Sequence, residues 1–316
     1  MTARTTESTD QSTGQTTGQA GQAGGKPDGW QPKMVALDID GTLLAWVEGS
    51  GQVYETIRPE VYDAVHRARA AGAHIVLASG RSPHGMTRIA DLLDLPLEGS
   101  PQDPAPGAKK GADDRLWIVA SNGAVIFRYP PMEVVREETF DAAPAVAAVL
   151  EHHPNALVAV EERGIGGYRV NMVFPDGELS GEQLVTDVDE IIGEPVSRVI
   201  VRDPDATAED FIDLAARLGL HGTDYVVGWT AWMDLSPVGI SKASGLQQVC
   251  DELGITAADV LAIGDGRNDI EMLAWAGRGV AMGQAVEEVR AAADAVTETV
   301  YDNGAAVEID RWFPST

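Results

Sequence analysis

Short runs of apolar residues alternate with longer amphipathic segments along most of the chain. Four such runs end in small or acidic residues, at 34–41, 74–80, 116–123 and 260–266. Near-continuous apolar runs of this length are typical of strands buried on both faces of a parallel sheet. The segments between them have apolar residues at helical spacing, as in 59–71. We therefore predict an α/β fold with a doubly wound, mostly parallel, Rossmann-like core sheet.

The intervals between these runs locate a second domain. The stretch between residues 81 and 242 is much longer than two crossovers and a strand require. Within it, the pattern predicts strands at 156–164, 168–174 and 196–202 and helices at 140–153 and 208–219. We predict an inserted α+β cap domain at 127–227, which divides the catalytic core into residues 31–126 and 228–316.

Two segments have the composition of irregular chain. Residues 1–28 consist mostly of Ser, Thr, Gln, Gly and Ala and contain no aromatic residue. Such a segment has too little apolar surface to form a core, so we predict a disordered tail over residues 1–30. The stretch 98–114 is rich in Pro, Gly and charged residues. We predict that it is a mobile surface loop.

Composition and charge limit the classes of partner. The 316 residues include 23 Lys and Arg against 49 Asp and Glu, a net charge of −26. This excess repels polyanions, so we expect neither nucleic acid nor a membrane surface as a partner. The apolar runs are shorter than the roughly 18 residues of a membrane span. One cysteine and no apolar signal segment indicate the cytoplasm, and the oligomeric state stays open.

Paired carboxylates close the first predicted strand. In the segment DIDGT at 38–42, Asp38 and Asp40 are two residues apart, so both side chains can face one site. Two such carboxylates can divide the chemistry, one ionised as a nucleophile or metal ligand and the other protonated as a general acid. The alternative is a turn after a strand, in which Asp hydrogen-bonds to nearby backbone.

Polar residues at the other predicted strand and helix ends favour the first interpretation. Ser79, Gly80 and Arg81 offer a hydroxyl, an open backbone N–H and a cation, which suit a phosphate oxyanion. Lys242 begins a predicted helix, where the helix N-terminus adds to its positive field. These groups follow strand ends, and ligands of doubly wound sheets bind at that edge.

A third group of residues offers oxygen ligands for a hard cation. Asp265 and Asp269, with Asn268 between them, follow the last predicted core strand. Oxygen donors, with few histidines available, favour Mg²⁺ over zinc. The combination of this group with the paired aspartates is far more specific than either alone.

Five motifs, in this order along the chain, resemble the haloacid dehalogenase superfamily and, within it, the Cof-type phosphatases with a large cap between the second and third motifs. They are DIDGTLL at 38–44, LASGR at 77–81, SNGA at 121–124, GISKASGL at 239–246 and GDGRNDIEML at 264–273. The resemblance covers about residues 33–310. It implies a Mg²⁺-dependent phosphomonoester hydrolase that works through an aspartyl phosphate.

The resemblance also implies a role for each motif residue. Asp38 would be the nucleophile, and Asp40 would protonate the leaving alcohol and then activate water. Mg²⁺ would be held by Asp38, the backbone carbonyl of Asp40 and Asp265, with Asn268 and Asp269 in supporting roles. The transferring phosphoryl group would contact Ser79, Gly80, Arg81, Lys242 and Asn268.

The expected substrate is a small phosphorylated metabolite, with a sugar phosphate as the first choice. Asp40 favours a phosphoryl substrate over dehalogenation, because an alkoxide leaving group needs a proton and a halide does not. Alternatives are a phosphatase for flavin mononucleotide or pyridoxal phosphate, a phosphomutase or phosphotransferase that uses the same aspartyl phosphate, and a non-catalytic binding protein. Within the cap, we expect residues 161–171 to contact the substrate.

Overall fold

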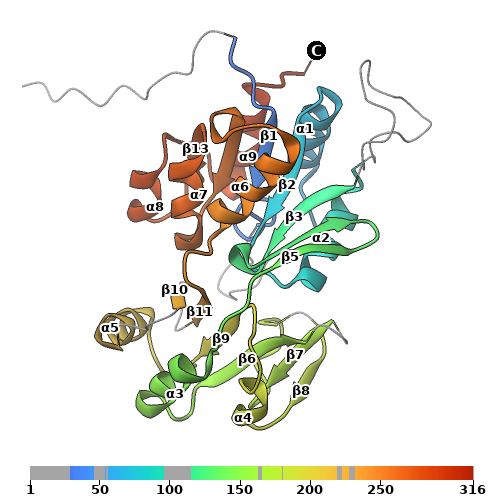
Figure 1. Cartoon of the computed structure of the whole chain (residues 1–316). Coiled ribbons are helices and arrows are strands. Elements are labelled where there is room, and N and C mark those ends of the chain that lie inside the picture. The colour runs from blue at the N-terminus through green and yellow to red at the C-terminus, as the bar shows by residue number, and fades with distance from the viewer. Residues whose placement is uncertain are drawn as a thin grey trace, which may run out of the picture.

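Two bodies make up the structure, a larger one in the upper half of Figure 1 and a smaller one below it. This computed structural model describes residues 29–45, 54, 56–95, 115–162, 166–179, 181–218, 223–227 and 232–315. The predicted tail up to residue 28 and the predicted loop at 98–114 lie outside these residues. The chain passes between the bodies after strand β5 (Glu133–Glu137) and after strand β11 (Trp232–Pro237), so the smaller body is an insertion.

An eight-stranded sheet organises the larger body, called the core below. Its order is β14-β13-β12-β1-β2-β3-β4-β5, parallel throughout except for the antiparallel pairs β3–β4 and β4–β5. The four predicted apolar runs form the neighbouring strands β12, β1, β2 and β3, which confirms the predicted α/β fold with a mostly parallel sheet. The other core strands are bounded as follows: β1 Met34–Leu37, β2 His74–Ala78, β3 Leu116–Ala120, β4 Val125–Tyr129, β12 Val260–Gly264, β13 Arg278–Ala281 and β14 Ala295–Val296.

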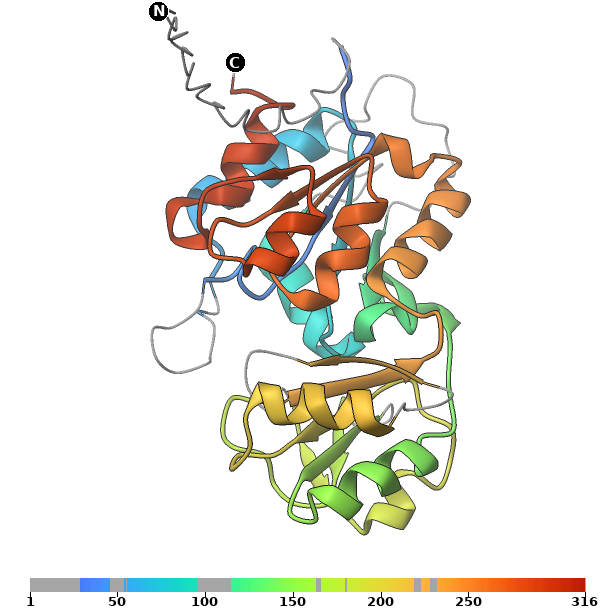
Figure 2. The ribbon, with the colours of Figure 1, turned by 90° about the vertical axis from the view of Figure 1, so that its left-hand side faces the viewer.

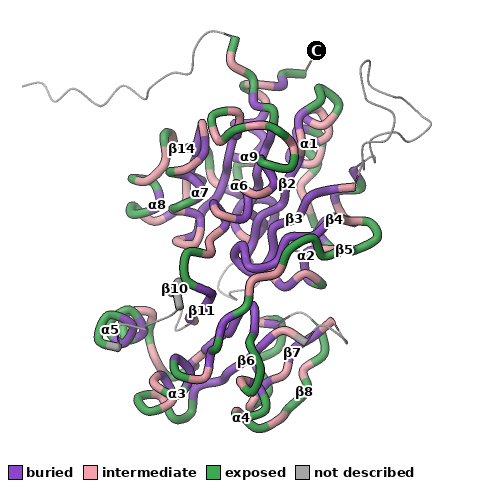
Figure 3. Tube along the Cα trace, viewed as in Figure 1, coloured by how far each residue is buried: buried purple, intermediate pink, exposed green. Residues whose placement is uncertain are grey.

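Helices cover both faces of the core sheet (Figure 2). In β1, Val35 and Leu37 pack in one apolar cluster with α1, α2 and α9, whereas Met34 and Ala36 pack in another with α6, α7 and α8. Neighbouring residues of a strand point to opposite faces, so a run buried on both faces must be apolar throughout. The resulting purple interior is visible in Figure 3. The core helices are α1 Pro59–Ala70, α2 Pro83–Leu93, α6 Lys242–Leu253, α7 Ile270–Trp275, α8 Glu287–Ala292 and α9 Gly304–Asp310, with short 3₁₀ helices at Ser121–Gly123, Ala257–Asp259, Arg267–Asp269 and Val300–Asp302.

The smaller body, called the cap below, has a six-stranded sheet in the order β10-β11-β9-β6-β7-β8. Its described pairs are antiparallel except for β7–β8. Helices α3 and α5 pack on one face of this sheet, against Val158, Val199 and Met233. The bounds are α3 Ala143–His152, β6 Leu157–Glu162, β7 Gly167–Val170, β8 Gln183–Val185, α4 Val188–Ile191, β9 Val199–Arg202, α5 Ala208–Leu218 and β10 Thr223–Val227.

The sheet memberships differ from the predicted cap range of 127–227 at both ends. Phe127 lies in β4, which together with β5 extends the core sheet by two antiparallel strands. At the other end, β11 (Trp232–Pro237) pairs with β9 and β10 inside the cap sheet. Antiparallel strands at the edge of a parallel sheet have the same residue pattern as cap strands, so the pattern alone does not assign them. None of the helices in the described ranges is long and apolar enough to cross a membrane.

Candidate active site

Four charged side chains lie buried together at the carboxyl ends of the core strands. Strands β1 and β12 are hydrogen-bonded neighbours, so Asp38 and Asp265 follow them side by side. Asp269 lies in the short 3₁₀ helix after β12, and Lys242 is the first residue of α6. Each of the four is at most 5% exposed. Because buried charges are costly unless they are paired, this cluster indicates a functional site.

An ammonium group lies between two of these carboxylates. Lys242 Nζ donates to Asp38 Oδ1 at 2.7 Å and to Asp269 Oδ1 at 2.6 Å. Reciprocal hydrogen bonds between Ser241 and Ser244 cap the helix that carries this lysine. Burial by itself lowers the pKa of Lys242, but the Asp269 and Asp38 carboxylates raise the pKa above its ordinary value. The lysine is therefore charged at neutral pH.

Three carboxylates share the cluster with that ammonium. Ligand oxygens of Asp38, Asp265 and Asp269 all lie within 4.8 Å of one another. The three carboxylates outnumber the one ammonium, and a divalent cation would offset the repulsion among them. Burial, followed by the charge of Asp269, raises the pKa of Asp38 well above its ordinary value, although Lys242 acts in the opposite direction. The all-oxygen ligand set and the excess of carboxylates over ammonium groups fit the Mg²⁺ ion expected from the sequence.

Neighbouring groups fix the orientation of these carboxylates. The second oxygen of Asp269 accepts hydrogen bonds from the backbone N–H groups of Asp265 and Gly266, both at 2.9 Å. Gln284 donates to the carbonyl oxygen of Gly41 at 2.6 Å and to Asp265 Oδ2 at 3.2 Å. Gln284 was not among the predicted site residues, and only the fold brings it to this position. Ligands held in this way are pre-organised for a cation.

The second aspartate of the first motif is paired with the arginine of the second. Arg81 donates to both carboxylate oxygens of Asp40, from Nε at 2.8 Å and from an Nη atom at 2.5 Å. Both side chains are about a quarter exposed. Burial lowers the pKa of Arg81, but the hydrogen bond to Asp40 and its charge raise the pKa above the ordinary value. The guanidinium predicted to contact phosphate is therefore directed at the predicted general acid in this structure.

The remaining predicted residues meet at a buried turn after β3. Ser79 is buried, its Oγ accepts from the backbone N–H of Arg81 at 3.2 Å, and its carbonyl oxygen accepts from the N–H of Asn122. A Cβ atom on Gly80 would lie 3.0 Å from Asn122 Oδ1, so Gly80 packs directly against that side chain. Asn268 Nδ2 donates to the same Oδ1 atom at 2.9 Å. The structure thus brings the predicted phosphate-binding and metal-binding segments together around Asn122.

The cap contributes three charged residues to the site, of which Arg198 and Asp234 were not predicted and Glu161 begins the predicted segment 161–171. Glu161, Arg198 and Asp234 lie on the face of the cap sheet opposite α3 and α5, because their strand neighbours pack against those helices. Arg198 donates to Asp234 at 3.0 Å and to Glu161 at 3.4 Å. Both carboxylates also bond to the core, Glu161 to Ser121 and Asp234 to Asn122. The feature of the sequence that could have indicated these residues is a charged residue within or next to an apolar run, as in VSRVIVR at 196–202.

The segment 161–171, expected to contact the substrate, contributes two residues to the cap face that meets the core. Glu161 and Tyr168 are opposite each other in the β6–β7 register and share the cap face that meets the core. Tyr168 is buried, and this burial raises its pKa above the ordinary value, although the charge of Arg198 acts in the opposite direction. Residues 163–165 lie outside the described part of the chain.

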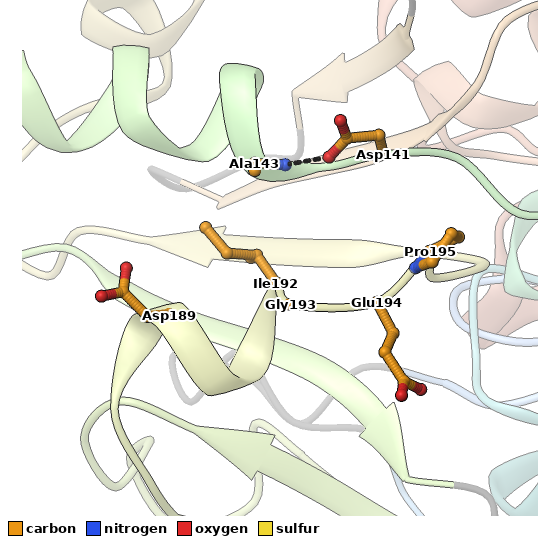
Figure 4. A pocket seen from close by; sticks show the side chains of 7 residues that line it. All are labelled: Asp141, Ala143, Asp189, Ile192, Gly193, Glu194 and Pro195. Atoms are coloured by element: carbon orange, nitrogen blue, oxygen red, sulfur yellow. Dashed lines mark hydrogen bonds between the residues drawn. The ribbon is translucent and has the colours of Figure 1, made fainter.

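A groove elsewhere on the cap has no comparable chemistry (Figure 4). Its volume is about 490 Å³, and none of the predicted site residues lines it. The Asp141 carboxylate accepts a hydrogen bond from the backbone N–H of Ala143 at 3.0 Å, at the start of α3. The residues that line the groove are Asp141, Ala143, Asp189, Ile192, Gly193, Glu194 and Pro195. We therefore assign the candidate active site to the core strand ends.

A family model of haloacid dehalogenase-like hydrolases matches residues 35–309. The chain belongs to this family. Among curated relatives of this hydrolase, phosphoglycolate phosphatase from Natronomonas pharaonis is 29% identical over 279 residues, which are 88% of this chain and 96% of the relative. The relatedness extends over nearly the whole length of both proteins.

Solved structures show the same architecture. The phosphatase BT1666 from Bacteroides thetaiotaomicron superposes with a TM-score of 0.69 at 25% identity, over 92% of this chain and 99% of that one. BT4131, a sugar phosphatase of subclass IIB of the superfamily, superposes with a TM-score of 0.68 at 23% identity, over 89% and 98% of the two chains. The predicted superfamily, its Cof-type cap and the phosphatase class of this hydrolase are confirmed.

Proposed function

We propose that this hydrolase is a Mg²⁺-dependent phosphomonoesterase that acts on a small phosphorylated metabolite through an aspartyl phosphate on Asp38. The observation that carries the proposal is the buried cluster of three carboxylates around one ammonium group, that of Lys242. Bound Mg²⁺ would offset the charge of the substrate phosphate, so that a carboxylate can attack it. Its ligands would be Asp38, the backbone carbonyl of Asp40 and Asp265, with Asn268 and Asp269 in support.

The reaction would proceed in two displacements at phosphorus. In the first, an Asp38 oxygen forms a bond to phosphorus, the bond to the leaving oxygen breaks, and Asp40 gives that oxygen its proton. In the second, Asp40 takes a proton from water, the water oxygen bonds to phosphorus, and the bond to Asp38 breaks. The phosphoryl oxygens would be bound by Ser79, Gly80, Lys242 and Asn268, and by Arg81 once it leaves Asp40. Release of Asp40 from the guanidinium would also let that carboxyl hold the proton it donates.

The charge of the cap face supports a sugar phosphate as the substrate class. Two carboxylates, those of Glu161 and Asp234, pair there with the single guanidinium of Arg198. Carboxylates accept hydrogen bonds from the hydroxyl groups of a sugar, whereas a carboxylate in the leaving group would be repelled. We therefore favour a hydroxyl-rich leaving group over phosphoglycolate, the substrate named for the Natronomonas relative.

A cytoplasmic location and a small-molecule ligand complete the proposal. The chain has one cysteine, Cys250, which is buried in the apolar cluster beneath α6. A scarcity of disulfides is typical of proteins in reducing compartments. The net charge of −26 disfavours polyanionic macromolecules as partners.

A panel of phosphorylated metabolites tests the proposed function. It contains hexose phosphates, phosphoglycolate, flavin mononucleotide and pyridoxal phosphate, and phosphate release is measured with Mg²⁺ and with EDTA. We expect Mg²⁺-dependent release that Asp38→Asn reduces at least about 10³-fold, as for loss of other catalytic nucleophiles. Asp213→Asn, at an exposed position of α5, is the matched control and stays at wild-type activity. Release that is indifferent to EDTA or to Asp38→Asn would overturn the mechanism, and isomerised sugar phosphate without release would indicate a mutase.

A further inference from the structure

The turn Ser121–Asn122–Gly123, called the hub turn below, contacts most elements of the site and has no role in the proposed reaction. All three residues are buried and have positive φ angles of 51°, 53° and 106°. Consecutive non-glycine residues in this region are uncommon, and such strain is concentrated at functional sites. A Cβ on Gly123 would lie 2.1 Å from the backbone oxygen of Ser241, so α6 approaches the turn too closely for any side chain there.

Asn122 has one hydrogen-bonding partner in the metal-binding segment and one in the cap. Its Oδ1 accepts from Asn268 Nδ2 at 2.9 Å, and its Nδ2 donates to Asp234 Oδ2 at 3.2 Å. An ionised carboxylate only accepts hydrogen bonds, so Asp234 selects the orientation in which the Asn122 NH₂ group faces the cap. The Asn122 oxygen then faces Asn268, whose NH₂ group must point toward it.

The orientation of Asn268 decides which of its atoms is available to the metal-binding segment. The NH₂ group of Asn268 is bound to Asn122. The Oδ1 atom of Asn268 lies 2.5 Å from the position that a Cβ atom on Gly266 would take, and Gly266 directly follows Asp265 in the sequence. An amide oxygen is a ligand for a hard cation, whereas an NH₂ group is not. A reversed amide would thus present the wrong atom to the cation.

The cap holds Asp234 rigidly for this contact. Its Oδ1 accepts from Arg198 Nε at 3.0 Å and from Trp232 Nε1 at 3.2 Å, which leaves Oδ2 directed at Asn122. The Arg198 side chain is 5% exposed and is shared with Glu161. Two neighbouring donors on one carboxylate oxygen fix the carboxylate group as a whole.

We propose that Asn122 is a positioning residue that makes the metal-binding orientation of Asn268 depend on closure of the cap. When the cap is closed, Asp234 sets the Asn122 amide, and Asn122 sets Asn268. When Asp234 is removed, both amides are free to reverse. A cap residue with no contact to the cation thereby controls cation affinity. The inference rests on the proposed metal-dependent function.

Binding of Mn²⁺, followed by its electron paramagnetic resonance signal, tests this coupling without substrate. Asp234→Ala is compared with Glu161→Ala, because each removes one carboxylate from Arg198 and one hydrogen bond to the hub turn, but only Asp234 leads to Asn268. We expect Asp234→Ala to weaken Mn²⁺ binding about 10-fold, the size of effect seen for outer-shell partners of metal ligands. Glu161→Ala should change it less than about 3-fold.

A carboxylate at position 122 provides the second test. In the double variant Asn122→Asp with Asp234→Ala, the new carboxylate accepts from Asn268, cannot reverse and no longer faces the Asp234 charge, so Mn²⁺ affinity should return to within about 2-fold of the wild type. Thermal melts verify folding; if Asp234→Ala does not fold, Asn122→Ala breaks the same contact from the core side and should weaken Mn²⁺ binding equally. Equal effects of Asp234→Ala and Glu161→Ala, or a double variant that binds Mn²⁺ as weakly as Asp234→Ala alone, would overturn the proposal. Wild-type phosphate release tests the proposed function separately.

Discussion

Replacement of Lys242 by methionine removes the ammonium between Asp38 and Asp269 while keeping the length of the side chain. Both hydrogen bonds are short, at 2.7 and 2.6 Å, and Lys242 is 0% exposed. Water therefore does not replace the lost partner, and the carboxylates are left buried without it. Removal of one partner from a buried ion pair costs about 3–5 kcal/mol. We expect Lys242→Met to lower the free energy of unfolding by that amount in EDTA.

A matched lysine elsewhere separates burial from the loss of charge. Lys33 pairs with Asp259 at 3.0 Å, but its side chain is 60% exposed. An exposed pair contributes about 0–1 kcal/mol, so Lys33→Met should be nearly neutral. Urea unfolding of both variants and the wild type in EDTA gives the comparison, and similar m-values confirm that the same surface unfolds.

The activity of the two variants adds an independent readout. Lys242→Met should lower kcat for phosphate release about 10²–10³-fold, because it removes a positive charge that we propose contacts the transferring group. Lys33→Met should leave kcat unchanged. The reasoning is refuted if the two variants lose the same small amount of unfolding free energy, since burial would then have no effect on the pair.

Three further outcomes follow from particular contacts. Gly123→Ala should lower the free energy of unfolding by about 1–3 kcal/mol and reduce kcat, because the new Cβ would meet the Ser241 oxygen. Gly72→Ala is the control, since Gly72 also has a positive φ but has open space around it, so that this variant measures backbone strain alone. Equal losses of unfolding free energy in the two variants would contradict the steric argument. Mg²⁺ at about 100 times its Kd should raise the free energy of unfolding by about 2.7 kcal/mol in calorimetry, and no shift would argue against the cation site. Burial, followed by the charges of Asp251 and Asp259, raises the pKa of Cys250 from 9.0 to about 11. Between these two pH values the folded state keeps a proton that the unfolded state releases, so the free energy of unfolding falls as the pH rises. Cys250→Ala should lack this part of the fall in urea unfolding measured across the same pH range, and parallel curves for the variant and the wild type would refute the prediction.

The pattern of apolar and polar residues was sufficient to predict the core strands and the edge of the sheet at which the candidate site lies. A strand buried on both faces must be apolar at every position, so β1, β2, β3 and β12 were recognisable from their residues alone. Polar residues directly after such strands meet at one edge of the sheet by topology, which is why Asp38 and Asp265 were expected together. The edge strands β4 and β5 were missed as core strands, since their pattern does not reveal which sheet they join.

Hydrogen bonds between side chains of distant segments could not be predicted from the residue pattern. The hydrogen bonds of Arg81 to Asp40 and of Asn122 to Asp234 depend on which rotamers and which sheets come into contact. The same holds for Arg198, whose two carboxylate partners come from different strands of the cap. A lone charged residue in an apolar strand indicates that a buried partner is needed, but not which residue provides it.

The residues proposed to bear the chemistry were thus identified from the sequence itself, because the proposed nucleophile, general acid, lysine and oxygen ligands lie within short motifs at strand and helix ends. Tertiary structure alone decided how the cap meets them. Its sheet turns Glu161, Arg198 and Asp234 toward the hub turn, and burial makes each of these charges depend on its partner. Hydrogen bonds between segments far apart in sequence have no local signature, since their geometry exists only once both domains are folded and packed together.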